Sequence, residues 1–187
     1  MLEYLRADLR RKHGHYLLAG GFVEKYIMTT LQLGTLAVFV YRFGNWAQLR
    51  AWAPLRWLAL AIYHPLNGLV RSFSGIDLDR RVPIGPGFII HNFSGICIDA
   101  VRIGDNFIVN QGVSVGRDWR NGGRPVIGDN VFLGSGAKVL GGIMLGNNVV
   151  VAANAMVDRS VPDNCTVVGV PARVISREGT SSYLQLK

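Results

Sequence analysis

Aliphatic residues recur every six positions through the second half of the chain. The motifs IGPG at 84, IGDN at 103 and 127, and LGNN at 145 each begin with an aliphatic residue, and further aliphatic residues follow at six-residue intervals. The resulting positions are Ile84, Ile90, Ile96, Ile103, Val109, Val115, Ile127, Leu133, Val139, Leu145, Val151 and Val157. This period predicts short strands joined by turns of Gly, Asn and Asp, coiled into a prism with the aliphatic side chains inside. The alternative, a β-sandwich, requires no such period.

The period slips by one residue between Ile96 and Ile103, and by six between Val115 and Ile127. The second slip is a loop, RDWRNGGRP at 117–125, which carries three arginines and a tryptophan. Because loops on a rigid scaffold commonly carry function, this loop is a candidate binding element.

The pattern before Gly75 is helical instead. Its apolar stretches, 26–41 and 57–70, are short for a bilayer span and predict helices that pack on the prism or lie at an interface. Pro54 is expected to begin or kink a helix, and Pro65 to end or kink one. We therefore predict a helical segment at 1–74, a β-helix at 75–175 and a tail at 176–187.

Composition and charge narrow the class of protein. Hydrophobic residues make up 49% and charged residues 17% of the 187 residues, which predicts a large core. The net charge of +8 lies mainly in residues 1–75, which hold nine basic and three acidic residues. No nucleic-acid-binding motif accompanies it, so we expect a peripheral contact with an anionic lipid surface or a polyanionic substrate, and no nucleic acid. Cys97 and Cys165 form no CxxC pair, and the charged N-terminus does not resemble a signal peptide, which predicts a cytoplasmic protein, at the inner face of the membrane.

His91 is the candidate catalytic residue, because of the four histidines it alone lies in the repeat region. An imidazole titrates near neutral pH and can take a proton from a hydroxyl group. The alternative is a histidine exposed at a turn. No GxSxG motif is present and Cys97 is expected in the core, so direct transfer is favoured over a covalent enzyme intermediate.

Five segments resemble the hexapeptide-repeat acyltransferases, and are most similar to the serine O-acetyltransferase group, including its exopolysaccharide-type members. They are GIDLD at 75–79, IGPGFIIHNFSGI at 84–96, VSVG at 113–116, GGRPVIGDNVFLGSGAKVLGGI at 122–143 and VVGVPARVI at 167–175. The resemblance implies a mainly β fold, a left-handed parallel β-helix with an N-terminal α-helical segment. It also implies acetyl-CoA as co-substrate, no metal, and a homotrimer with active sites between adjacent prisms.

The resemblance also suggests roles for individual residues. It implies His91 as general base, although the family's histidine stands one place later, where this chain has Asn92. Either a local bulge restores the position of His91, or the base sits differently. Asp77, with Asp79 as fallback, would orient the imidazole. Acceptor contacts are expected from Asn92, Arg117, Trp119, Arg120 and Arg124, and CoA contacts from Gly116, Gly134, Ser135, Ala137, Lys138, Ala152, Ala153 and Arg173.

The acceptor is expected to be a sugar, a glycan or another small metabolite, as in polysaccharide biosynthesis. In the serine enzymes the loop ends in Arg-His-Pro, whereas here it reads Gly123-Arg124-Pro125. The acidic residue before the family's catalytic histidine is also replaced, by His91. Free serine remains the alternative acceptor, and a non-catalytic scaffold the alternative class. A zinc hydrolyase on this fold is disfavoured, because it would need several histidines on the coils and this chain has only His91 there.

Overall fold

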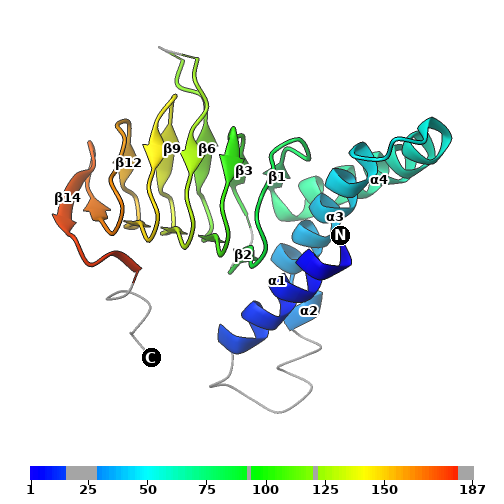
Figure 1. The fold of residues 1–187 in the computed structure, drawn as a ribbon, viewed down its shortest axis with the longest axis horizontal. Helices are drawn as coiled ribbons and strands as arrows, with labels where there is room; N and C mark the ends of the chain where they lie inside the picture. Colours follow the sequence, from blue (N-terminus) through cyan, green and yellow to red (C-terminus); the bar gives the residue numbers. More distant parts are fainter. Residues whose placement is uncertain (16–28, 92–93, 120–121, 181–187) are drawn as a thin grey trace.

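The computed structural model describes residues 1–15, 29–91, 94–119 and 122–180 (Figure 1). Helices α1 (Leu2–His15), α2 (Thr29–Leu31), α3 (Leu33–Gln48) and α4 (Ala53–Ser74) lie at one end of a stack of short strands. Helix α4 ends at Ser74 because Gly75 adopts a left-handed conformation (φ 63°), and the first strand begins at Ile76. Pro54 lies in the first turn of α4, whereas Pro65 lies inside it and does not end it.

The strands form a β-helix with three parallel sheets. The β1 sheet contains β1 (Ile76–Leu78), β3 (Ile96–Ile98), β6 (Ser114–Gly116), β9 (Lys138–Leu140) and β12 (Met156–Val157). The β4 sheet contains β4 (Arg102–Ile103), β7 (Val126–Ile127) and β10 (Met144–Leu145). The β2 sheet contains β2 (Ile89–Ile90), β5 (Ile108–Val109), β8 (Phe132–Leu133), β11 (Val150–Val151) and β13 (Thr166–Val168), with β14 (Arg173–Ser176) added antiparallel.

All twelve aliphatic residues of the six-residue period lie in one buried core, each 4% exposed or less. The predicted register was wrong at one of them, because Val115 lies opposite Ile98 and not opposite Ile96. Eight residues separate Ile90 from Ile98, whereas six separate the equivalent Val109 and Val115. The corner after β2, which includes His91, is therefore two residues longer than the same corner in the next coil.

Asparagines stack at another corner of the prism. Asn106, Asn130, Asn148 and Asn164 have φ between 54° and 58°, a conformation that asparagine tolerates better than most residues. Their side-chain amides donate to the next asparagine in the column, at N–O distances of 2.9–3.1 Å. The recurring Asn of the sequence motifs is thus explained by turn geometry and by a hydrogen-bonded column between coils.

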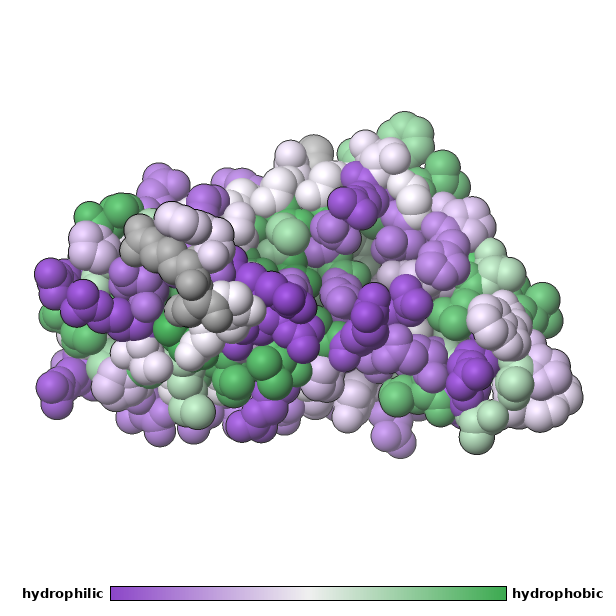
Figure 2. Space-filling model, turned by 90° about the horizontal axis from the view of Figure 1, so that it is seen from above, coloured by the Kyte–Doolittle hydropathy of each residue, from purple (hydrophilic) through white to green (hydrophobic). Residues whose placement is uncertain are grey.

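Helix α4 leaves a row of large apolar side chains in solvent. Leu58, Ile62, Leu66, Leu69 and Phe73 follow one face of the helix and are 41–75% exposed. Figure 2 shows hydrophobic surface at this helical end of the molecule. None of the described helices has the length and apolar character needed to cross a membrane.

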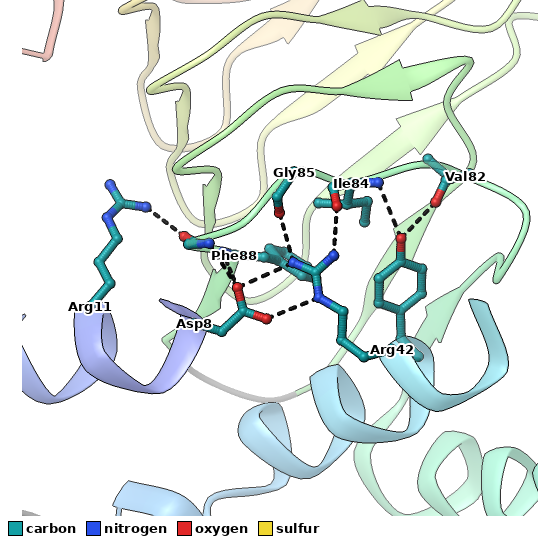
Figure 3. Close-up of polar contacts among 9 residues, drawn as sticks. Asp8, Arg11, Arg42, Val82, Ile84, Gly85 and Phe88 are labelled. Atoms are coloured by element: carbon teal, nitrogen blue, oxygen red, sulfur yellow. Dashed lines mark hydrogen bonds and ion pairs between the residues drawn. The ribbon is translucent and has the colours of Figure 1, made fainter. Parts of the chain in front are cut away.

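Side chains of α1 and α3 cover the first coil, which has no earlier coil to pair with. Tyr41 donates to the Val82 carbonyl oxygen at 2.6 Å and accepts from the Ile84 N–H at 3.2 Å. Arg42 donates to the carbonyl oxygens of Ile84 and Gly85 (Figure 3). A buried backbone group left without a partner costs about 1–3 kcal/mol, so these bonds stabilise the end of the prism.

Candidate active site

His91 follows β2 directly, at the edge where the β2 sheet meets the β1 sheet. Its backbone N–H donates to the Val109 carbonyl oxygen at 3.2 Å, and its side chain is half-buried. The backbone N–H groups at the same place in the next three coils, on Asn110, Gly134 and Ala152, make the equivalent bonds. We call this column of four residues the His91 edge. With strands about 4.8 Å apart, it spans about 14 Å from His91 to Ala152.

Four of the predicted CoA-binding residues accompany His91 on this edge. Gly134 and Ala152 belong to the column itself, and Ser135 follows Gly134 and lies one coil before Ala153. A side chain on Gly134 would lie 2.6 Å from the Ala153 backbone nitrogen, so only glycine fits there. Ala153 is exposed and Ser135 and Ala152 are half-buried. The edge therefore presents small residues above the histidine.

Ala137 was also predicted to contact CoA, but it does not lie on the surface. Its side chain is fully buried in the prism core. Its N–H donates to the Gly134 carbonyl oxygen, and its own carbonyl accepts from the Ser114 N–H. Ala137 precedes β9, with its side chain in the core and both backbone polar groups bonded within the prism.

The remaining CoA candidates lie away from the His91 edge. Lys138 is exposed on the β1 sheet, with its Nζ 3.4 Å from the Gly112 carbonyl oxygen and from Ser114 Oγ. Gly116 ends β6, beside the loop. Arg173 begins β14 and lines a cleft of about 190 Å³ with Arg159, which was not predicted from the sequence.

Asp77 points outward from β1 and lies opposite Cys97 of β3. Its carboxylate pairs with Arg71 of α4 at 3.1 Å, and Asp79 pairs with Arg81 at 3.5 Å. These four residues help to line a polar cleft of about 370 Å³ between α4 and the β1 sheet. The full lining is Tyr63, Asn67, Arg71, Asp77, Leu78, Asp79, Arg80, Arg81, Cys97, Ile98 and Asp99. His91 is not among the residues that line this cleft.

Cys97 is exposed in this cleft, contrary to the prediction that it is part of the core. Ile96 and Ile98 face inward and are buried, so the residue between them faces outward. Desolvation, with the nearby carboxylates of Asp77 and Asp99, raises the pKa of the Cys97 thiol. The thiolate that a nucleophile needs is thus disfavoured.

The loop at 117–125 is anchored to Asp99. Arg124 pairs with this carboxylate at 3.1 Å and Arg117 at 3.5 Å. Two guanidinium groups thus face one carboxylate, and Trp119 between them in sequence is 87% exposed. Asp99 was not predicted, although the outward alternation after Ile98 would have indicated it. Asn92 and Arg120 lie outside the described residues.

Known proteins resemble the chain in sequence and in structure. The family model of the bacterial transferase hexapeptide (six repeats) matches residues 124–159. A serine acetyltransferase of Staphylococcus xylosus is 35% identical over 154 residues, which are 81% of this chain and 70% of that protein. A serine acetyltransferase of Synechococcus elongatus is 39% identical over 117 residues, 61% of this chain and 48% of that protein. The chain spans about half the length of the Synechococcus elongatus protein and of similar Staphylococcus aureus serine acetyltransferases.

The crystal structure of serine acetyltransferase from Brucella abortus strain S19 superposes with a TM-score of 0.77 at 26% identity, over 95% of this chain and 69% of that one. The predicted fold class, a left-handed parallel β-helix with an N-terminal helical segment, is confirmed by this similarity and by the three parallel sheets. The similarity to the Staphylococcus xylosus protein extends over more than two thirds of its length. The chain therefore belongs to the serine acetyltransferase family of hexapeptide-repeat transferases.

Proposed function

We propose that the protein is an acetyl-CoA-dependent O-acetyltransferase that uses His91 as general base. The observation that carries this proposal is the His91 edge, where the only histidine of the prism shares a column with Gly134 and Ala152. An extended thioester arm could lie along the small residues of this edge with its acyl end at the imidazole. The similarity to serine acetyltransferases supports an acetyl transfer.

The transfer is direct in this proposal. The His91 imidazole takes the proton of the acceptor hydroxyl while the hydroxyl oxygen attacks the thioester carbonyl carbon. The carbon–sulfur bond then breaks, and the CoA thiolate leaves and takes up the proton. Because Gly116 lies away from the His91 edge in one subunit, backbone N–H groups near Gly116 would have to reach the oxyanion from a neighbouring subunit. The raised pKa of the Cys97 thiol argues against a covalent acyl-cysteine.

The CoA phosphates would be bound by cationic side chains beyond the His91 edge. Lys138 is exposed on the β1 sheet, and Arg173 and Arg159 line one cleft at the far end of the prism. Guanidinium groups bind phosphate by paired charged hydrogen bonds. This arrangement would place the nucleotide end of CoA several coils from His91.

The acceptor we favour is a sugar hydroxyl or that of another small metabolite. Arg117 and Arg124 share the Asp99 carboxylate, which combines donors and acceptors in one polar cluster. Hydroxyl-rich ligands use both kinds of group. If the acceptor is a glycan unit, the protein would act in polysaccharide biosynthesis.

L-Serine is the second candidate acceptor, and the names of the relatives favour it. The polar cleft beside β1 holds carboxylates and guanidinium groups, which would suit an amino acid's two charges. Arg124 could bind its carboxylate if Asp99 releases it.

Three copies are expected to assemble, because the family resemblance implies active sites that lie between adjacent prisms. A neighbouring prism could bring complementary residues to each His91 edge. This proposal agrees with the arrangement that the family resemblance implies.

Contact with an anionic lipid surface is a further part of the proposed function. Helix α4 carries the exposed apolar row and also Arg56 and Arg71, of which Arg71 pairs with Asp77, and α3 and α4 contain no acidic residue. Such a helix combines apolar insertion with attraction to anionic headgroups. It would place the protein at the inner face of the cytoplasmic membrane.

Thiol release from acetyl-CoA, measured with a panel of acceptors, tests the proposal. We expect saturable turnover with at least one sugar or related hydroxyl compound, and a lower kcat/KM for L-serine. Efficient acetylation of L-serine alone would establish the second candidate. Absence of acceptor-dependent thiol release across the panel and with L-serine would favour a scaffold.

A further inference from the structure

Helix α1 binds the strand that leads to His91 through three charged side chains. Asp8, Arg11 and Lys12 are spaced so that they share one face of the helix. Asp8 accepts hydrogen bonds from the N–H groups of Gly87 and Phe88, both at 2.8 Å, and Arg11 donates to the Gly87 carbonyl oxygen at 2.6 Å (Figure 3). Lys12 binds furthest along, with its Nζ 3.0 Å from the Ile90 carbonyl oxygen.

The bond from Lys12 acts on the peptide group next to the proposed base. That group consists of the Ile90 carbonyl and the His91 N–H. Lys12 binds its oxygen from the helical side, and the Val109 carbonyl accepts its N–H from the next coil. The peptide plane from which His91 extends is thus held on both sides, once by the prism and once by α1.

The position of Lys12 is costly for an ammonium group. Lys12 is 3% exposed, and its neighbours include Leu5, Leu9, Val38 and Phe39. Its hydrogen-bond acceptors are Thr35 Oγ1 at 2.7 Å and the Ile90 oxygen, both uncharged. Desolvation lowers the pKa of Lys12 to about 8. An apolar side chain would avoid that desolvation but would leave the Ile90 carbonyl oxygen without this donor, so the lysine is retained where the peptide group before His91 needs a hydrogen bond.

We infer that Lys12 is a positioning residue, which holds the Ile90–His91 peptide and thereby sets the direction of the His91 imidazole. The inference rests on the proposed function, in which His91 is the base. Small displacements of a catalytic group cost activity steeply, about 100-fold for 1 Å. The helical segment then serves catalysis as well as covering the first coil.

The test compares Lys12→Met with Arg11→Met. Both variants remove a cation that binds a carbonyl of the same segment, but Lys12 acts next to His91 and Arg11 acts at Gly87. We expect Lys12→Met to lower kcat about 10–100-fold with little change in the acetyl-CoA KM. Arg11→Met and the exposed-site control Arg10→Met should keep kcat within about twofold. Equal kcat losses in Lys12→Met and Arg11→Met, or none in Lys12→Met, would overturn the inference.

A second readout is independent of turnover. The Hε1–Cε1 NMR signal of His91, assigned with His91→Gln, should shift or broaden in Lys12→Met and stay in place in Arg11→Met. An unchanged signal in Lys12→Met refutes the inference, whether or not the wild-type protein transfers acetyl groups. Absence of acetyl transfer by the wild type would by itself refute only the proposed function. If Lys12→Met does not fold, Thr35→Val, which removes the other acceptor of Lys12, must change the same signal.

Discussion

At the scale of residues, the proposed chemistry depends on one imidazole. His91→Ala should lower kcat by about 10²–10⁴-fold, the usual contribution of a positioned general base, while acetyl-CoA still binds. His64 is exposed on α4 and offers a matched control, so His64→Ala should leave kcat unchanged. Initial rates at saturating acetyl-CoA measure the kcat of both variants. Turnover of His91→Ala within a few fold of wild type would place the base elsewhere, with Asn92 the first residue to test.

Arg124 is the residue from which we expect acceptor selectivity. A charged hydrogen bond contributes about 1.5–3 kcal/mol, so Arg124→Ala should raise the acceptor KM by about 10–100-fold. The acetyl-CoA KM should change little, because the CoA candidates lie on the His91 edge and beyond it. Arg102→Ala, at an exposed position of the β4 sheet, is the control. A parallel rise of both KM values would show that the loop arginines serve CoA instead.

At the scale of elements, the contact between α1 and the first coil should be visible in the pH dependence of stability. Folding lowers the pKa of Lys12 from 10.5 to about 8, so between these values the unfolded chain binds more protons and the free energy of unfolding rises with pH. The rise is of the order of 3 kcal/mol. Burial raises the pKa of Tyr41 to about 12 from 10.0, which has the opposite effect above pH 10.

Urea denaturation at pH 7.5, 8.5 and 9.5 separates the two groups, because Tyr41 contributes little below pH 10. Wild type should gain stability relative to Lys12→Met across this series, since other titrating groups are common to both proteins. A constant difference between the two proteins would mean that Lys12 keeps an ordinary pKa in the fold.

The exposed row on α4 should bind anionic vesicles at low salt. Exchanging Ile62, Leu66 and Leu69 for Gln should weaken binding at least about tenfold, since each buried apolar side chain contributes about 1.5–3 kcal/mol. Val101, Met144 and Ile175 are 48–63% exposed on the prism, so their exchange for Gln is the matched control. Co-sedimentation measures binding. Loss of self-association without loss of vesicle binding would instead identify the row as a contact between copies.

The sequence predicted the kinds of element better than it predicted where they end or where the repeat departs from its period. The six-residue period located the buried aliphatic residues because every coil repeats the same turn chemistry. It failed at Ile96, where the longer corner after β2 shifts the register by two residues. Pro65 was expected to end or kink a helix, and it does not end it, because α4 continues to Ser74. Local propensity cannot foresee these exceptions, which depend on packing.

The candidate site was less predictable than the fold. His91 and the small residues of its edge could be chosen from the repeat and the resemblance, and Asp99 from the outward alternation after Ile98, whereas Lys12 could not. A lysine in the stretch RADLRRKHGH reads as a solvated side chain of a helix. Its role becomes evident only when the end of the prism is known to need donors for its carbonyl groups.

At the scale of the whole molecule, an active trimer is the central expectation. Light scattering of purified protein, collected together with activity across the same chromatographic peak, should give at least three 20.5-kDa subunits. The proposed site lies between adjacent prisms, so dissociation should abolish turnover. Full activity in a peak of one or two subunits would contradict the shared site.

The two ends of the described prism are closed in different ways. The strands of this stack form backbone hydrogen bonds only along the axis of the prism. The uncovered end of one copy could therefore pair with the uncovered end of another copy, as one coil pairs with the next. Side chains of α1 and α3 occupy those groups at one end, and at the other β14 turns back antiparallel. A single chain therefore stops after a fixed number of coils, where the same repeat without its terminal segments would elongate, copy upon copy, into a filament.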